Sequence, residues 1–416
     1  MNADPTNEPS PAPPAPVSTA ATPAPPPTPT LTPPPAPSAT PDGGQLARML
    51  ADLEELVVCE SFSADLAAVA RSADVVAAQG ARYLGAEPER IVVAGVTHLK
   101  WTFGTPRVLL LGHHDTVWPM GSLTTHPWSV TDGIVRGPGV FDMKAGLVMV
   151  FHALASLPSL DGICVLVTGD EEVGSDASRA LIEEVARECA ATFVLEASAD
   201  GGALKTGRKG TSQYELVAHG KAAHSGLEPE KGVNAAIEAA HLTLALDAVT
   251  AGINAGESEG WRTTVTPTVV TAGSTSNTVP ATAAVTVDVR VPTLAAQEKT
   301  DTALRALKAT LPGARVEVRG GPNRPPLEET ASAGLFATAR ELARTLGLGE
   351  LASTAVGGAS DGNFTAGVGC PTLDGLGAVG GGAHADHEHV IAAELVPRTR
   401  LLAALVRHVV DAEAAR

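Results

Sequence analysis

The sequence is poor in aromatic residues and has no cluster of positive charge. Phe, Trp and Tyr make up 3% of the 416 residues. A core must therefore be packed mainly from Ala, Val, Leu and Gly, which suits layered α/β structure. The formal net charge is −17, and no run of Lys or Arg is present. Because binding to a phosphate backbone needs a concentrated basic face, we expect no nucleic-acid partner.

Cysteine is also scarce, and long apolar runs are missing. Cys59, Cys164, Cys189 and Cys370 are widely spaced and form no Cys-x-x-Cys pair, so we interpret them as reduced thiols of a cytoplasmic protein. By inspection, no apolar run reaches the length of a membrane span. We therefore expect a soluble protein with no membrane partner.

Residues 1 to 42 hold half of the 32 prolines and carry no Lys or Arg. The segment has no apolar stretch of the kind that a secretory signal needs. A Pro/Ala/Thr composition cannot bury enough apolar surface to fold, so we expect a disordered tail. Apolar periodicity typical of helices begins near Gln45, and the length of the remaining chain predicts two compact units.

The first part of the folded chain alternates apolar strands with helices. Strands are expected at 107–111, 163–167 and 192–195, and helices at 145–157 and 176–189. Continuous apolar strands between helices indicate a largely parallel sheet that is buried on both faces. We therefore predict an α/β fold, and such sheets carry their sites at the carboxyl ends of the strands.

The pattern changes after about Lys205. Alternating strands are expected at 213–219, 265–271 and 283–291, and helices at 233–246 and 294–307. This combination of alternating strands and helices predicts an α+β unit with an antiparallel sheet, inserted at 206–319. The catalytic domain would then consist of residues 43–205 and 320–416, with a last helix at about 392–413.

Two polar residues directly follow the strand at 107–111. Side chains two positions apart on an extended chain share a face, so His113 and Asp115 point the same way and His114 points the opposite way. His113 can then bind a metal ion while Asp115 accepts the second imidazole N–H or orients the ring through the local turn. Alone, this pair is only a weak indication of a metal site.

Acidic residues occur at two further places. Asp142 lies in a turn-rich segment that opens a helix, where it can bind metal or simply cap the helix. Asp170, Glu171 and Glu172 follow the strand at 163–167, and three adjacent carboxylates repel one another unless a cation compensates. One glutamate can coordinate a metal ion while the other takes a proton from water; a solvated acidic turn is the alternative.

The last candidates are Glu196, which ends the strand at 192–195, and a glycine-rich loop that holds three histidines within six residues. Three neighbouring histidines favour metal contact over an ordinary surface position. The residues alone do not choose among His384, His387 and His389.

In this order the motifs resemble the M20 family of metallopeptidases, and within it the glutamate carboxypeptidase (carboxypeptidase G2) group. The likeness covers about 45–416 and rests on Gly-His-His-Asp-Thr-Val, Gly-Val-Phe-Asp with the following Lys and Gly, Asp-Glu-Glu-Val-Gly-Ser, and the later Glu and His. It implies two zinc ions, with Co²⁺ or Mn²⁺ as alternatives. The implied ligands are His113 and Glu196 for one ion, Glu172 and His384 for the other, and Asp142 as the bridge.

The resemblance also implies roles beyond metal binding. Glu171 would be the general base and later proton donor, and Asp115 would orient His113. The inserted unit would be a lid that commonly forms a homodimer. His224 matches the lid histidine of the family, which is often supplied across the dimer and could stabilise an oxyanion. A histidine buried or solvated in a turn is the alternative interpretation.

Substrate contacts are expected from the insertion and the domain junctions. Asn277 and Arg290 resemble family positions near the substrate, although Arg290 could equally anchor the lid by an internal ion pair. Arg208, Lys209 and Arg324 add positive charge at the junctions and would attract an acidic substrate.

A glycine-rich loop at 357–363 opens a short helix. In the family this segment lines the active site, so Gly358 and Ser360 are candidate contacts, with helix amides binding a substrate carboxylate. Capping of the helix by Ser360 or Asp361 is the alternative and can hold at the same time.

We therefore expect a zinc-dependent hydrolase that cleaves an amide bond next to a free carboxylate, in a small molecule or short peptide. The first choice is a carboxypeptidase that releases C-terminal glutamate or a similar amino acid. Alternatives within the family are an N-acyl-amino-acid deacylase, a succinyl-diaminopimelate desuccinylase and a dipeptidase. An inactive binding or regulatory protein with this fold is disfavoured, because all five ligand positions and Glu171 are filled.

Overall fold

The computed structural model describes residues 42–256 and 260–414. The disordered tail predicted for residues 1–42 lies outside the described residues, except for Asp42, which opens helix α1 (Asp42–Val58).

A six-stranded sheet forms the first layer, in the order β1-β2-β6-β3-β7-β16. Its strands are β1 (Glu89–Val93), β2 (Val96–Phe103), β3 (Val108–His113), β6 (Ile163–Thr168), β7 (Ala191–Val194) and β16 (Thr372–Leu373). The four strands from β6 to β16 are parallel, whereas β1 and β2 are antiparallel. The prediction of an α/β fold with a mostly parallel sheet is therefore confirmed.

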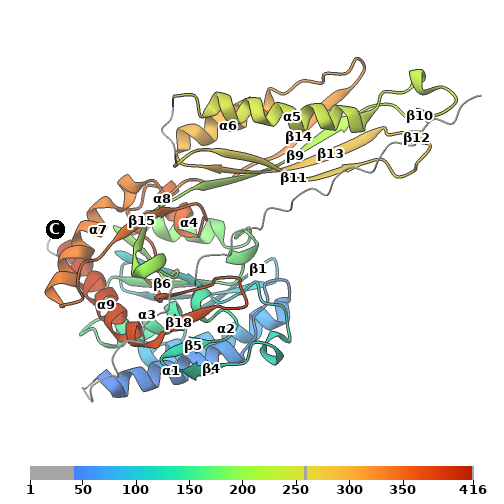
Figure 1. Cartoon of the computed structure of the whole chain (residues 1–416). Helices are drawn as coiled ribbons and strands as arrows, with labels where there is room; N and C mark the ends of the chain where they lie inside the picture. Colours follow the sequence, from blue (N-terminus) through green and yellow to red (C-terminus); the bar gives the residue numbers. More distant parts are fainter. Residues whose placement is uncertain (1–41, 257–259, 415–416) are drawn as a thin grey trace, which may run out of the picture. The chain divides into compact units, whose positions relative to one another are not determined.

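Helices cover both faces of this sheet (Figure 1). Val108 and Leu110 of β3 pack in the core cluster that α1 shares with α2 (Leu66–Leu84), α3 (Ala145–Ala155) and α9 (Ala392–Ala414). Leu109 and Leu111 pack on the other side with α4 (Arg179–Glu188) and α8 (Gly362–Gly367). Burial on two faces explains why these strands are continuously apolar.

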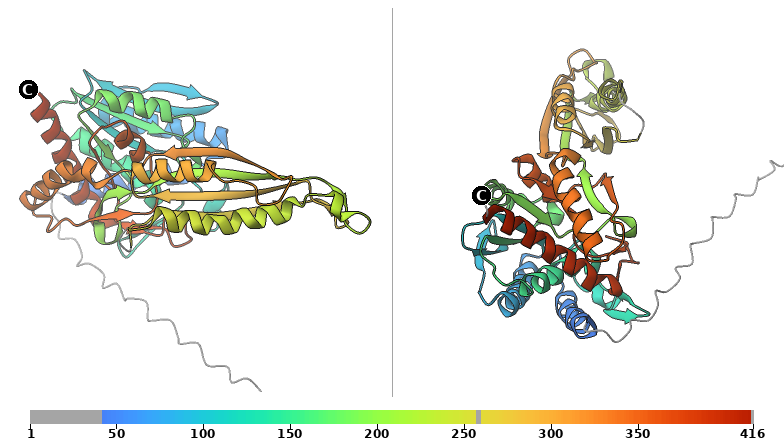
Figure 2. Two further views of the ribbon diagram at one scale, coloured as in Figure 1. Left: turned by 90° about the horizontal axis from the view of Figure 1, so that it is seen from above. Right: turned by 90° about the vertical axis from the view of Figure 1, so that its left-hand side faces the viewer.

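A separate four-stranded antiparallel sheet, in the order β11-β13-β9-β14, forms with its own helices the unit that is called the four-stranded layer below. It consists of β9 (Gly210–His219), β11 (Thr264–Ala272), β13 (Thr282–Val291) and β14 (Arg315–Arg324). Helices α5 (Ala235–Ile253) and α6 (Leu294–Arg305) lie on one face of it (Figures 1 and 2). Every second residue of β13 is buried, as the alternating pattern indicates. The strands of this sheet lie between residues 210 and 324, so the last strand extends past residue 319, the predicted end of the insertion. The domain limits themselves remain a prediction.

The chain after β14 returns to the first layer. β15 (Ser353–Val356) pairs in parallel with β8 (Leu204–Arg208), and β16 pairs with β7. Helix α7 (Glu329–Thr345) contacts β8, β16 and α9. A second small sheet joins β18 (His389–Ile391) to β5 (Ile134–Arg136), flanked by β17 (Gly380–Gly381) and β4 (Ser129–Thr131). The remaining elements are β10 (Ala223–His224), β12 (Thr278–Val279), η1 (Ser122–Thr124), η2 (Val140–Lys144), η3 (Glu171–Val173), η4 (Asp200–Gly202) and η5 (Pro229–Lys231).

Among the helices of residues 42–256 and 260–414, α5 alone is long and apolar enough to cross a membrane by length and composition. The expectation that no apolar run reaches that length is therefore wrong for α5. Its Leu242 and Leu246 pack on the four-stranded sheet, and its buried Glu238 accepts the N–H groups of Thr310 and Leu311 at 2.9 and 2.7 Å. These contacts are typical of a helix that covers a sheet.

The four cysteines are free thiols, as predicted. Burial raises the pKa of Cys164 to about 11 and that of Cys189 to about 12, because it penalises the thiolate. These thiols are therefore poorly reactive.

Candidate metal centre

The candidate residues gather at one edge of the six-stranded sheet. His113 ends β3, η3 with Glu171 and Glu172 follows β6, and Glu196 lies two residues after β7. Since β6, β3 and β7 are parallel neighbours, their carboxyl ends meet there.

Asp142 reaches this edge through the irregular turn η2. Two glycines allow the close packing: a Cβ on Gly146 would lie 2.2 Å from the carbonyl oxygen of Leu195, and one on Gly112 would lie 2.8 Å from Sδ of Met143. Helix α3 begins after Lys144, so Asp142 does not cap it. The Asp142 carboxylate instead faces two histidines.

The five predicted ligands form two groups that share Asp142. Nε2 of His113 lies 3.5 Å from Oδ1 of Asp142 and 3.5 Å from Oε1 of Glu196. Nε2 of His384 lies 3.1 Å from Oδ2 of Asp142 and 3.2 Å from Oε2 of Glu172. Within each group the candidate ligand atoms lie within 4.8 Å of one another. The two oxygens of Asp142 therefore face different groups.

The structure also separates the three C-terminal histidines. His384 belongs to the second group, whereas Nδ1 of His389 lies 3.0 Å from the carbonyl oxygen of His387. The loop geometry thus agrees with the choice of His384 that the family resemblance implies, which the residues alone left open.

The two ligand groups contain more carboxylates than histidines. Hydrogen bonds to Asp142 and Glu172 raise the pKa of His384 to about 10. Burial would raise the pKa of Asp142, but His113 and His384 hold it below its ordinary value. Three carboxylates therefore stabilise positive charge on two histidines, and a cation bound between them would meet the same attraction.

Asp115 fixes His113 and the acidic turn together. Nδ1 of His113 lies 3.0 Å from the carbonyl oxygen of Asp115 and 3.3 Å from its carboxylate, so this nitrogen donates. In the neutral ring, Nε2 then carries the lone pair; it is buried and has no hydrogen-bond partner among the described residues. The Asp115 carboxylate also accepts the N–H groups of Glu171 and Glu172, each at 3.2 Å, and the hydroxyl of Ser63 at 2.7 Å.

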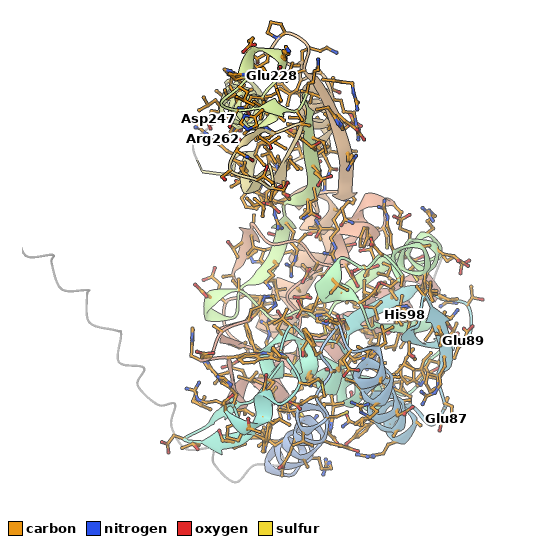
Figure 3. The ribbon with its side chains drawn as sticks, turned by 90° about the vertical axis from the view of Figure 1, so that its right-hand side faces the viewer. Glu87, Glu89, His98, Glu228, Asp247 and Arg262 are labelled. Carbon is orange, nitrogen blue, oxygen red and sulfur yellow. The ribbon has the colours of Figure 1, made fainter. Side chains whose placement is uncertain are left out.

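His114 points to the opposite side of β3, as its place in the strand predicts. Its Nε2 donates to the carbonyl oxygen of Thr97 at 3.0 Å. Both His114 and His98, which is labelled in Figure 3, are buried. Burial lowers the pKa of His114 to about 4, so the ring is neutral in the folded protein.

His114 should make stability fall in mild acid. Its folded-state pKa of about 4 lies below the ordinary value of 6.5, so the unfolded chain binds a proton first as pH falls. The contribution, about 3 kcal/mol, is complete above pH 6.5 and is lost between pH 6.5 and 4. Urea unfolding of metal-free protein across this range should show a steeper pH dependence for the wild type than for His114→Gln. Equal slopes would contradict this assignment.

Glu171 lies beside both groups but belongs to neither. The residue is 8% exposed, and Nη2 of Arg324 lies 3.0 Å from Oε1 of its carboxylate. Burial raises the pKa of Glu171 well above its ordinary value, although Arg324 opposes this shift. Such a carboxylate is suited to take up a proton and hold it.

Two buried arginines join the centre to the surrounding segments. Nη2 of Arg324 also donates to Ser175 at 2.7 Å and to Asp361 at 3.2 Å. Arg208 donates from Nε to Asp374 at 2.7 Å and from Nη2 to Glu196 at 3.4 Å. Both guanidinium groups are thus engaged by carboxylates of the protein itself.

The glycine-rich loop lies next to Arg208. Nη1 of Arg208 donates to the carbonyl oxygen of Gly358 at 3.1 Å, and the hydroxyl of Ser360 donates to Asp374 at 2.7 Å. Oγ of Ser360 also accepts the N–H of Gly362, the first residue of α8, at 3.1 Å, whereas the N-cap residue Asp361 makes no side-chain cap hydrogen bond. Asp374 was not foreseen, although it follows β16 as Glu196 follows β7.

The other predicted contacts lie in the inserted segment, outside both ligand groups: Arg290 is in the four-stranded sheet, whereas His224 belongs to the separate two-stranded sheet of β10 and β12 and Asn277 directly precedes β12. β10 pairs with β12, which places the exposed His224 beside Asn277, whose carbonyl oxygen accepts the N–H of Ser225 at 2.9 Å. Arg290 forms an ion pair with Asp288 at 2.9 Å, as the alternative interpretation held.

Lys209 is likewise engaged locally. Its Nζ donates to the carbonyl oxygen of Arg262 at 2.5 Å and lies 5.1 Å from the ring centre of Trp261.

A cavity of about 500 Å³ adjoins Arg208. It is lined by Ala199, Asp200, Ala203, Lys205, Arg208, Thr354, Val356 and Gly358. Burial and the charge of Arg208 lower the pKa of Lys205. No ion pair or hydrogen bond of the Lys205 side chain is found with any described residue. No pattern in the sequence distinguishes this lysine.

Comparison with known proteins gives consistent matches. The sequence profile of "Peptidase family M20/M25/M40" matches residues 109–408. Carboxypeptidase G2 from Pseudomonas sp. (strain RS-16) is 31% identical over 377 residues, which cover 85% of this chain and 86% of the relative. Succinyl-diaminopimelate desuccinylase 2 from Shewanella loihica is 31% identical over 173 residues, 37% of this chain and 46% of the relative.

Solved structures share the fold. Aminopeptidase PepT from Bacillus cereus superposes with a TM-score of 0.67 at 22% identity, covering 88% of this chain and 99% of the aminopeptidase chain.

Proposed function

The chain belongs to peptidase family M20/M25/M40, whose members are metal-dependent hydrolases, and on this basis we propose that it is a di-zinc carboxypeptidase that releases C-terminal glutamate or a similar amino acid. The observation that carries the proposal is the placement of Asp142. Its two oxygens face two separate groups of histidine and carboxylate.

The donor atoms fit two metal ions. His113, Asp142 and Glu196 would hold one, and Asp142, Glu172 and His384 the other. The buried Nε2 of His113 has no hydrogen-bond partner among the described residues, as expected of a nitrogen whose partner is a cation. Imidazole and carboxylate ligands suit zinc, and Co²⁺ or Mn²⁺ accept the same donors. Three protein ligands leave a position open for substrate or water.

Glu171 is the general base of the proposed reaction. When bound, the two ions supply Lewis-acid polarisation of the scissile carbonyl and lower the pKa of water. Glu171 takes the proton of the attacking water and returns it to the leaving amine. Its place next to the ligand Glu172, outside both ligand groups, supports this role. Arg324 holds its carboxylate and Asp115 holds its backbone N–H.

The cavity beside Arg208 supports an acidic substrate. Arg208 is already paired with Asp374 and Glu196, whereas Lys205 brings a cation without a partner among the described residues. The side-chain carboxylate of a C-terminal glutamate in this cavity would pair with Lys205. Gly358, which lines the cavity, and Ser360 beside it remain candidate substrate contacts, as do Lys209 and Arg324.

Lys205→Met should therefore change specificity more than catalysis. Hydrogen bonds to charged groups contribute about 1.5–3 kcal/mol, so kcat/KM for a substrate ending in glutamate should fall about 10–100-fold. A substrate ending in alanine should be affected little. Lys100→Met is the matched control, because Lys100 already pairs with Glu89 at 2.8 Å. Parallel losses for both substrates would argue against a specificity role.

The four-stranded layer supports a homodimer. β11 is an edge strand with exposed Val269 and Val270, and α5 exposes Ile237 and Leu244. Exposed apolar surface beside an unpaired edge favours pairing with a second copy. In that assembly His224 would stabilise the oxyanion, with Asn277 and Arg290 near the substrate, in the active site of the partner subunit. Cytoplasmic localisation stays a prediction.

Substrate and metal measurements test the proposal together. Purified protein should contain two equivalents of zinc, cobalt or manganese and should release glutamate from N-acyl-glutamates and folate-like substrates. Removal of metal by a chelator should abolish release, and added Zn²⁺ should restore it. A protein that binds no metal under metal-replete conditions would overturn the scheme. Release of succinate from succinyl-diaminopimelate, with no hydrolysis of glutamate substrates, would favour the desuccinylase alternative.

A further inference from the structure

Glu388 is a buried carboxylate that accepts four hydrogen bonds yet belongs to neither ligand group. It is 3% exposed. Oε1 accepts the N–H of Phe141 at 2.8 Å and that of Asp142 at 3.0 Å. Oε2 accepts the N–H of Gly139 at 3.0 Å and the indole N–H of Trp118 at 2.7 Å. Three of the four donors are backbone groups of the turn that carries Asp142.

That turn needs an acceptor from elsewhere in the chain. η2 runs only from Val140 to Lys144, and Asp142 and Met143 within it have non-helical backbone angles. The first N–H groups of a helix have no acceptor within it. Gly139 has φ of 71°, and a Cβ there would lie 2.5 Å from Cγ2 of Thr116, so the turn is tightly confined.

The same carboxylate ends the loop that carries His384. This loop is short: Ala385 donates its N–H to the carbonyl oxygen of Gly382, and Glu388 donates its N–H to that of Ala385, each at 2.9 Å. The His384 side chain is half exposed, so little packing fixes it. The buried side chain of Glu388 therefore ties the His384 loop to the Asp142 turn, in addition to the contact between His384 and Asp142 themselves.

We propose that Glu388 is a positioning residue that sets the separation of Asp142 and His384, and thereby the affinity of the centre for its second metal ion. The inference rests on the proposed function, because it assumes that these residues bind metal. Asp142 is shared by both groups, so a shift of its turn weakens the first group as well, but only the second group also loses the position of His384 and is therefore affected more. A carboxylate is required, because an amide offers one accepting oxygen and directs its own N–H groups at the remaining donors.

Glu388→Gln should weaken binding of the second ion about 10–100-fold, the usual effect of removing a group that orients a metal ligand. The measurement is zinc titration of metal-free protein against a chromophoric chelator, with circular dichroism to confirm folding. Glu60→Gln is the matched control: Glu60 also accepts two backbone N–H groups, at 2.9 and 3.1 Å, but its donors Gly121 and Leu123 lie outside the Asp142 turn and outside both ligand groups. Its two zinc affinities should equal those of the wild type.

Trp118→Phe keeps the test decisive if Glu388→Gln fails to fold. It removes one of the four donors, so the second affinity should fall by a smaller factor than in Glu388→Gln. If Glu388→Gln folds and binds zinc with wild-type affinities, the inference is overturned. If only Trp118→Phe folds, wild-type affinities in that variant overturn it. If the wild type itself binds no metal, the proposed function fails instead, which separates the two conclusions.

Discussion

Replacement of Glu171 by Gln is expected to lower kcat by about 10²–10⁴-fold, the usual contribution of a general acid or base. The side chain keeps its size, and the backbone N–H that donates to Asp115 is unchanged. Because Glu171 belongs to neither ligand group, the variant should still bind two metal ions. Steady-state kinetics and metal analysis of the same preparation measure the two quantities together.

A surface substitution provides the control. Glu341→Gln removes an exposed glutamate that pairs with Arg344, and it should leave kcat unchanged. If Glu171→Gln retains wild-type kcat, the base assignment is refuted. If it loses both activity and metal, Glu171 instead supports the ligand groups, and its catalytic role is left without support.

Asp142→Asn is expected to have the widest effect on metal content. The amide has a single accepting oxygen, so it cannot serve both groups as the two carboxylate oxygens do. Both ions should bind more weakly by over about 10²-fold, more than the loss of a merely orienting partner causes. Hydrolysis should fall to the detection limit.

Variants that change a ligand of only one group are the comparison for Asp142→Asn. Glu196→Gln affects only the first group and His384→Asn only the second, so each should retain one ion that binds well. Equal metal loss from all three variants would contradict the bridging role of Asp142. Retention of two tightly bound ions by Asp142→Asn would refute its role as a ligand.

Much of the site was predictable because parallel strands encode it. Apolar runs located β3, β6 and β7, and the polar residue after each run marks the same edge of the sheet. That rule points to His113, to the acidic turn at 170–172 and to Glu196, whereas the choice of Glu172 within the turn came from the family resemblance. Asp142 and His384 lie on irregular segments, so their inclusion came from the family resemblance and not from periodicity.

Other residues depend on contacts that no local pattern records. Asp374 follows a strand of two residues, too short to stand out. Lys205 looks like any lysine of a strand; its cavity is completed by the segment near Thr354, far along the chain. No local pattern reveals the role of Glu388, because its four donors come from two distant segments of the chain. Arg290 was left open in the sequence, and its ion pair with Asp288 depends on side-chain geometry.

The order in which the ligands occur along the chain bears on biosynthesis. His113, Asp142, Glu172 and Glu196 precede the four-stranded layer, whereas His384 follows it. A ribosome must therefore complete that entire layer between the fourth ligand and the fifth. Until then the nascent chain can offer the first ligand group but not the second. If the proposed centre binds two ions, loading of the second group would consequently be a late event that follows the pairing of β16 with β7.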